Sequence, residues 1–229
     1  MSLILHSHPL ASYCWKVLIA LYEKDIPFET RMVNLGDPAA RAAFEALWPT
    51  AKIPLLEDDG RVVPETSIMI EYIDQIRPGP SRLLPGTPQE QLEVRLWDRV
   101  FDSYVMEPMQ RFVAQHLRPE GARDARELDN TRRALVSAYA LIEAKIGERT
   151  WAAGETFTLA DCAAAPSLFY AATIEPFAAG QTRLAAYFAR LMARPSVART
   201  IAEARPFFQY YPLRHALPTQ YRPEDDNAG

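Results

Sequence analysis

Residues 53–76 read IPLLEDDGRVVPETSIMIEYIDQI, and this stretch decides the fold of the first half of the chain. Two short apolar runs at 53–57 and 61–63 flank the turn sequence Asp58-Asp59-Gly60, which predicts a β-hairpin. Apolar residues then recur with helical spacing, which predicts a helix over 65–76. The side chains expected to face inward from this helix are Ile68, Tyr72, Ile73 and Ile76.

The residues before this hairpin alternate between strand and helix patterns. We expect a short apolar strand at 3–5, a helix at 12–24, a strand at 28–33 and a short helix at 38–47. The helix at 12–24 is apolar on most of its sides, which predicts that it is buried. The predicted order is therefore βαβαββα, an α/β domain over residues 1–79.

A cluster of helix-breaking residues divides the chain near residue 80. Pro78-Gly79-Pro80 and Pro85-Gly86 cannot lie inside a helix or a strand. The part that follows, residues 80–229, has only helical patterns, and Pro108 predicts a kink or break in the first of them. From Pro206 onward we expect an extended tail that ends in acidic residues. The predicted helices span 89–117, 124–146, 159–172, 183–192 and 196–204.

Composition excludes several classes of function. The net charge is −4 with scattered basic residues, which disfavours a nucleic-acid-binding protein. No apolar run reaches the roughly 20 residues of a membrane helix, and residues 1–10 lack the pattern of a secretory signal. We therefore expect a cytoplasmic protein. The two cysteines, Cys14 and Cys162, form neither a CxxC pair nor a metal-ligand cluster, so we expect no disulfide framework and no metal.

The first candidate site feature lies where residues 8–17 run from a strand into a helix. The N-terminus of a helix presents free N–H groups and a partial positive charge, which stabilise an anion such as a thiolate. Ser12 is placed there as a possible N-cap. Serine also caps helices without any chemistry, so this feature alone leaves both interpretations open.

The second feature is the Ile53-Pro54 pair. Proline is disfavoured within a central strand, and at the start of a strand it can form a cis peptide bond. If the Ile53 backbone is turned outward, its N–H and C=O can pair with a bound peptide. The preceding Lys52 could meet a carboxylate, although a solvated surface lysine is the commoner explanation.

The third feature is Pro64-Glu65-Thr66-Ser67 at the start of the helix over 65–76. Free N–H groups there suit a carboxylate, the Thr66 hydroxyl can donate to it, and Glu65 can accept from an ammonium group. The three features together describe a site for a short peptide with a free amino-acid end and a thiol. Glutathione has these parts: its γ-glutamyl end would meet Glu65 and Thr66, its backbone Ile53, its glycine carboxylate Lys52, and its sulfur the Ser12 region.

The same motifs, in the same order, resemble those of the glutathione transferase superfamily, and in particular its serine/cysteine-type bacterial and zeta-like members. The resemblance implies a thioredoxin-like N-terminal domain, an all-α C-terminal domain, a homodimer, and a detoxifying transferase with glutathione as cosubstrate. A capping box of Thr158 and Asp161 would open a buried helix of the second domain. The motifs that carry the resemblance are residues 13–17, 52–54, 64–66 and 157–161.

The sequence departs from the family where the thiol would be activated. By alignment through residues 16–18, the usual catalytic position falls on Ala11, which cannot donate a hydrogen bond through its side chain. Ser12 is the nearest hydroxyl and is our candidate catalytic residue, with Tyr13 and Cys14 in reserve. Lowering a thiol pKa by about two units needs roughly 3 kcal/mol. One charge-assisted hydrogen bond, at roughly 1.5–3 kcal/mol, together with the helix dipole is sufficient.

A second substrate, a small hydrophobic electrophile, is expected between the two domains. The thiolate would attack its electrophilic carbon, or take part in an isomerisation or dehalogenation. Most aromatic and methionine residues at helical spacing are ordinary core, and His116 could simply favour a helix C-terminus. The candidate pocket residues are Leu10, Tyr13, Tyr104, Met109, Phe112 and His116.

Three other functions compete with this one. Ala11 favours a protein that binds glutathione or a partner without catalysis. Cys14 would be the nucleophile of a thiol–disulfide reductase, although the helix pattern predicts that it is buried. A structural dimer module is disfavoured by the Ile53-Pro54 and Glu65-Thr66 pairs.

Overall fold

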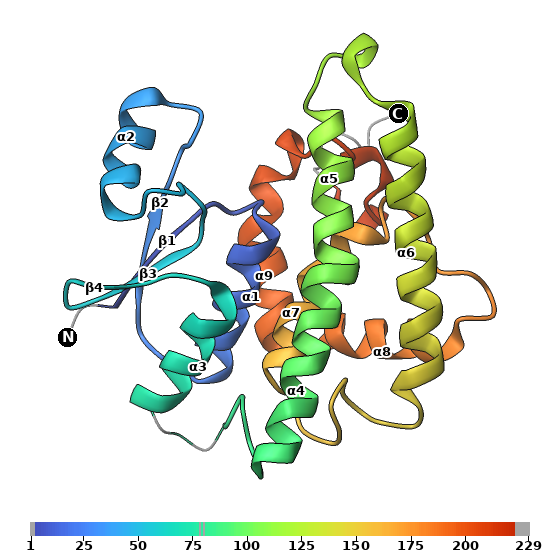
Figure 1. Cartoon of the computed structure of the whole chain (residues 1–229), viewed down its shortest axis with the longest axis horizontal. Helices are drawn as coiled ribbons and strands as arrows, with labels where there is room; N and C mark the ends of the chain where they lie inside the picture. The colour runs from blue at the N-terminus through green and yellow to red at the C-terminus, as the bar shows by residue number, and fades with distance from the viewer. Residues whose placement is uncertain (1–2, 78, 80, 223–229) are drawn as a thin grey trace.

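The computed structural model describes residues 3–77, 79 and 81–222 and has a sheet-containing domain beside a helical domain (Figure 1). The sheet has the strand order β2-β1-β3-β4. Strand β1 runs parallel to β2 and antiparallel to β3, which is antiparallel to β4. The strands are β1 (Leu3–Ser7), β2 (Glu29–Met32), β3 (Leu55–Asp58) and β4 (Arg61–Val63).

Three helices complete the first domain and confirm the predicted βαβαββα order. They are α1 (Ser12–Glu23), α2 (Pro38–Leu47) and α3 (Thr66–Ile76). The inward face of α3 is formed by Met69, Ile70 and Ile73. The prediction that Ile68 faces inward is wrong, because Ile68 lies on the other side of α3 and is 55% exposed.

The second domain is helical, as predicted. Figure 1 shows α4 and α5 following one another as a single long rod, with α6 alongside and α7 behind. No described helix is both long enough and apolar enough to cross a membrane. The helices are α4 (Pro88–Val100), α5 (Glu107–His116), α6 (Ala125–Ile146), α7 (Leu159–Ala171), α8 (Thr182–Ala193) and α9 (Pro195–Ala204).

Pro108 does not break the long helix. A π-helical segment, η1 (Phe101–Met106), connects α4 to α5, and Pro108 lies in the first turn of α5. Proline has no N–H to donate to the carbonyl four residues earlier. The wider turn directly before Pro108 accommodates this missing bond, and π turns of this kind are frequent at functional sites.

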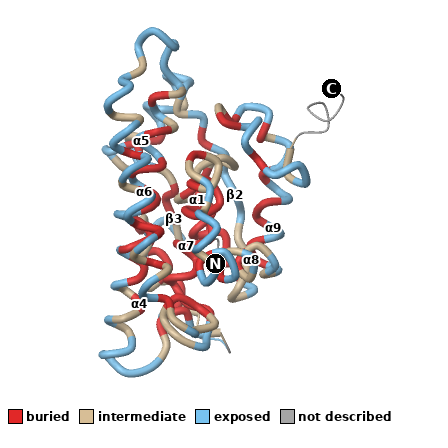
Figure 2. Tube along the Cα trace, turned by 90° about the vertical axis from the view of Figure 1, so that its right-hand side faces the viewer, coloured by how far each residue is buried: buried red, intermediate tan, exposed pale blue. Residues whose placement is uncertain are grey.

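The two domains share one hydrophobic core centred on α1 and α7. Almost all residues of both helices are buried, which Figure 2 shows as red along their traces. The ring of Trp15 packs 5.0 Å from both Phe169 and Tyr170. The predicted capping interaction of α7 is present, since Asp161 accepts from the Thr158 N–H at 2.8 Å and from its hydroxyl at 3.1 Å.

The chain after α9 is not an extended tail over the described residues. It forms three short 3₁₀ helices, η3 (Arg205–Tyr210), η4 (Arg214–Ala216) and η5 (Thr219–Tyr221). Phe208, Tyr211, Leu213 and Leu217 are buried in the main core, and burying these apolar side chains holds the segment against the protein. The acidic end, residues 223–229, lies outside the described residues.

Candidate functional site

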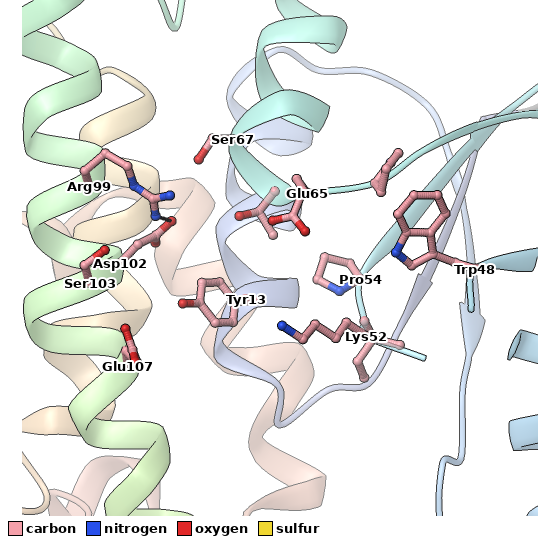
Figure 3. Close-up of a pocket in the computed structure, with 13 residues that line it drawn as sticks. Tyr13, Trp48, Lys52, Pro54, Glu65, Ser67, Arg99, Asp102, Ser103 and Glu107 are labelled. Carbon is pink, nitrogen blue, oxygen red and sulfur yellow. Dashed lines mark hydrogen bonds and ion pairs between the residues drawn. The ribbon is translucent and has the colours of Figure 1, made fainter. Parts of the chain in front are cut away.

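A cleft of about 270 Å³ brings together six of the predicted site residues (Figure 3). One wall comes from the loop before β3 and the start of α3, and Tyr13 of α1 contributes to the floor. The facing wall comes from the long helix of the second domain, through Arg99, Asp102, Ser103 and Glu107. Besides Tyr13, the predicted residues in the cleft are Lys52, Ile53, Pro54, Glu65 and Thr66.

The start of α3 is built to present donors. Glu65 precedes α3 with φ 66° and ψ 118°, an unusual conformation for a residue other than glycine. Such backbone positions concentrate at functional sites. The N–H groups of Thr66 and Ser67, in the first helical turn, find no acceptor among the described residues. In Figure 3, the Glu65 carboxylate and the Lys52 ammonium group reach into the same space, so the cleft offers both signs of charge.

The Ile53-Pro54 peptide bond is cis. Strand β3 begins only at Leu55, and no backbone hydrogen bond of Ile53 is formed within the described part of the chain. The N–H and C=O of Ile53 are therefore available to an extended ligand, which is the arrangement that the sequence predicts.

Ser12 lies in a second, adjoining cavity of about 530 Å³, and Ile53 lines both cavities. Ser12 is the first residue of α1, and Ala11 is the N-cap, so the prediction that Ser12 caps the helix is wrong. Its side chain is instead held from the second domain, because Gln110 Nε2 of α5 donates to Ser12 Oγ at 3.1 Å. A hydroxyl that accepts in this way keeps its own proton for another acceptor.

Of the six residues predicted for a second-substrate pocket, three line one of these two cavities. Leu10 and Met109 line the larger cavity, whereas Tyr13 lines the first cleft.

The remaining three predicted pocket residues line neither cavity, which corrects the prediction. Phe112 is buried in the core, His116 stacks on it with ring centroids 4.6 Å apart, and Tyr104 is 54% exposed. Gln110 and Val113 of α5 line the larger cavity beside Met109, although the sequence analysis did not select them.

A buried ion cluster joins the cleft to the domain interface, and sequence reasoning missed it. Lys16 Nζ lies 2.6 Å from Asp98 Oδ1, 2.7 Å from Asp102 Oδ2 and 3.0 Å from Ser67 Oγ, and Ser67 donates to Asp98 at 2.6 Å. The Lys16 side chain is fully buried and both aspartates are almost so. The available signal was charged residues within apolar helical patterns, beside Trp15, Trp97 and Phe101.

The burial of Cys14 limits its chemistry. The thiol has no exposed surface, and this burial raises its pKa to about 12, against which the His8 N–H contact at 3.5 Å acts only weakly. Buried cysteines of high pKa are poor nucleophiles. Burial and the nearby charge of Asp102 also raise the pKa of Tyr13, so its hydroxyl stays protonated and acts as a donor.

Known proteins match both domains of this chain. The glutathione S-transferase N-terminal domain model matches residues 5–81, and the C-terminal domain model matches residues 100–195. A glutathione S-transferase of Pseudomonas putida is 31% identical over 69% of each chain. The maleylacetoacetate isomerase of Rattus norvegicus is 29% identical over 72% of this chain and 76% of its own.

One solved structure is also similar to this chain over both domains. It is a glutathione S-transferase from Methylobacterium radiotolerans in complex with glutathione sulfonate, 31% identical, with a TM-score of 0.75. The match covers 87% of this chain and 94% of that one. The two domains, the cleft at their junction and these likenesses lead to one conclusion: the chain belongs to the glutathione S-transferase family.

Proposed function

We propose that this protein is a glutathione transferase in which Ser12 activates the thiol of glutathione for transfer to a small apolar electrophile. The arrangement of the two adjoining cavities carries the proposal. The cleft with Lys52, Glu65 and Thr66 suits the charged ends of the tripeptide, and Ile53 suits its backbone. Ser12 and the mostly apolar wall of the second cavity lie directly beyond Ile53. Relatives whose names include glutathione support the same cosubstrate.

The hydrogen bond from Gln110 supports the choice of Ser12. Because Gln110 occupies the Ser12 oxygen as a donor, the serine proton is free to be donated to a thiolate. A charge-assisted hydrogen bond of this kind is worth roughly 1.5–3 kcal/mol. The sulfur would then attack the electrophilic carbon of a substrate in the larger cavity, or take part in a glutathione-dependent isomerisation or dehalogenation.

Substitution of Ser12 tests this proposal. Ser12→Ala removes the proposed donor together with the acceptor of the Gln110 hydrogen bond, so we expect glutathione affinity to change little and kcat/KM for conjugation to fall by roughly 10- to 150-fold. Ser137→Ala, an exposed serine on α6, is the matched control. Unchanged turnover in Ser12→Ala would move the role to Tyr13 or to a backbone N–H group, which Tyr13→Phe separates.

A glutathione-binding protein without catalysis is the second candidate, because alanine occupies the usual catalytic position. Ala11 contributes no side-chain hydrogen bond at the start of α1. Calorimetric binding of glutathione, without conjugation of any member of a panel of electrophiles, would favour this function. The complete burial of Cys14 argues against a disulfide reductase that uses this thiol.

We further expect a cytoplasmic homodimer that detoxifies electrophiles. The dimer is supported by exposed apolar side chains on neighbouring helices: Ile68 of α3 is 55% exposed, and Leu92 and Leu96 of α4 are each 57% exposed. Glu71 and Arg95 join α3 to α4 beside these residues through two hydrogen bonds of 2.8 Å. Exposed apolar side chains that gather on the surface are typical of a protein interface.

A further inference from the structure

The larger cavity contains a histidine that the proposed mechanism does not use. Its walls are mainly apolar, including Leu10, Val33, Leu35 and Met109, and His8 is one of the few polar groups among them. In a pocket of this kind, a small number of polar groups fixes the orientation and the identity of the ligand. His8 lies in the loop between β1 and α1, close in sequence to Ser12.

The hydrogen bonds of His8 determine which ring nitrogen carries the proton. The Leu10 N–H donates to His8 Nδ1 at 3.2 Å, so Nδ1 is an acceptor. A neutral imidazole with an accepting Nδ1 carries its hydrogen on Nε2. Protonating Nδ1 would place its hydrogen against the N–H of Leu10, which disfavours the imidazolium form. Partial burial acts in the same direction and lowers the pKa of His8.

The second nitrogen of the ring is unoccupied. His8 Nε2 makes no hydrogen bond with any described residue, and it is not one of the fully buried polar atoms that lack a partner. The contact of His8 with Phe207, with centroids 6.4 Å apart in an edge-on arrangement, supports the ring from the C-terminal segment. His8 therefore lines the cavity with its ring held by these contacts and with an Nε2–H that is not fully buried.

We propose that His8 is a specificity-determining residue whose Nε2–H donates to an acceptor oxygen of the second substrate, so that the cavity prefers apolar ligands that contain a carbonyl group. This inference rests on the proposed function, because it assigns the larger cavity to the electrophile. With an unsaturated ketone, the thiolate sulfur bonds to the β-carbon and the alkene electron pair moves toward the carbonyl oxygen. A solvent proton then ends on the α-carbon, and there is no leaving group. The Nε2–H would stabilise the charge that develops on that oxygen.

Ligand binding tests the proposal independently of turnover. Benzylacetone and butylbenzene differ chiefly in the carbonyl group, and neither has an electrophilic alkene. We expect the full-length protein to bind benzylacetone more tightly than butylbenzene. The ratio of the dissociation constant of butylbenzene to that of benzylacetone should fall by roughly 3- to 10-fold in His8→Phe. His8→Gln, whose amide retains an N–H donor, should restore the ratio. His215→Phe, at an exposed histidine in η4, should leave it unchanged.

Conjugation of benzylideneacetone and of benzyl chloride, from which the thiolate displaces chloride, separates this inference from the proposed function. We expect His8→Phe to reduce kcat/KM for the ketone more than for the chloride. The inference is overturned if His8→Phe keeps the wild-type ketone preference, or if Tyr210→Phe abolishes that preference instead. If the ketone preference depends on His8 but neither compound is conjugated, the inference stands and the proposed transferase activity fails.

Discussion

Removing the buried ammonium group of Lys16 gives a stability change whose size and pH dependence can both be worked out. The substitution Lys16→Met keeps the length of the side chain but leaves Asp98 and Asp102 without their shared cation. Breaking a buried ion pair by removing one partner typically costs about 3–5 kcal/mol. The two aspartates keep partial compensation, since Ser67 donates to Asp98 at 2.6 Å and Arg99 lies 2.7 Å from Asp102.

Protonation sets a limit on this loss. One proton shared by the two carboxyl groups would restore the net charge of the cluster. Protonating an aspartate of ordinary pKa, about 3.9, costs about 4 kcal/mol at pH 7 and about 1.5 kcal/mol at pH 5. Burial, together with the charge of Asp98, already raises the pKa of Asp102 even though Lys16 opposes the rise, so Asp102 is the expected site of the proton.

Urea denaturation at pH 7 and at pH 5, at one fixed protein concentration, measures the effect. We expect Lys16→Met to lower the free energy of unfolding by about 3–5 kcal/mol at pH 7 and by roughly 2–3 kcal/mol less at pH 5. Arg41→Met breaks an exposed pair with Glu45 and should cost under about 0.5 kcal/mol at both pH values. A loss below 1 kcal/mol that does not vary with pH would refute the reasoning.

Three further predictions concern the domain junction, the thiols and the proposed dimer. Burial raises the pKa of Asp74, but the hydrogen bonds from Lys24 and the Leu83 N–H outweigh it, so the pKa of Asp74 in the folded protein is lowered. The stability that the Asp74 charge provides is present above about pH 3.9, the pKa of an aspartate in the unfolded chain. It is lost as the pH falls through the lower pKa of the folded protein. Urea denaturation should therefore show a deficit in Asp74→Asn at pH 7 that shrinks toward pH 3, and a constant deficit would contradict this. Burial raises the pKa of Cys14 to about 12 and that of Cys162 well above its usual value, so neither thiol of the native protein should react with Ellman's reagent at pH 8 until denaturant is added, and rapid labelling would show that one is accessible. Leu96→Glu should halve the mass measured by light scattering while the exposed Val136→Glu should not, and an equal mass for both variants would place the interface elsewhere.

The order of elements could be predicted because local patterns decide it. The turn Asp58-Asp59-Gly60 separates two strands whose register, with Leu56 opposite Val63, follows from the hairpin. The cleft residues around Ile53 and Thr66 could be found because helix termini and X–Pro bonds have local backbone consequences. These features need no knowledge of distant contacts.

The other features of the site depend on contacts between residues far apart in the sequence, which local patterns do not show. Tyr104 lies in the π segment and is exposed, and Phe112 packs into the core from α5, although the sequence pattern places both beside the predicted pocket. The hydrogen bond between Gln110 and Ser12 joins residues of different domains. Likewise, the aromatic C-terminal segment lacks the periodicity of a long helix, so its packing against the core follows from tertiary structure alone.

A crystal structure of the full chain with bound glutathione is the most direct test of the central claim. We expect the γ-glutamyl end at Glu65 and Thr66, the cysteinyl backbone paired with Ile53, and the sulfur within hydrogen-bond reach of Ser12 Oγ. A tripeptide bound outside the cleft, or a sulfur directed at Tyr13 or into solvent with no contact to Ser12, would contradict it.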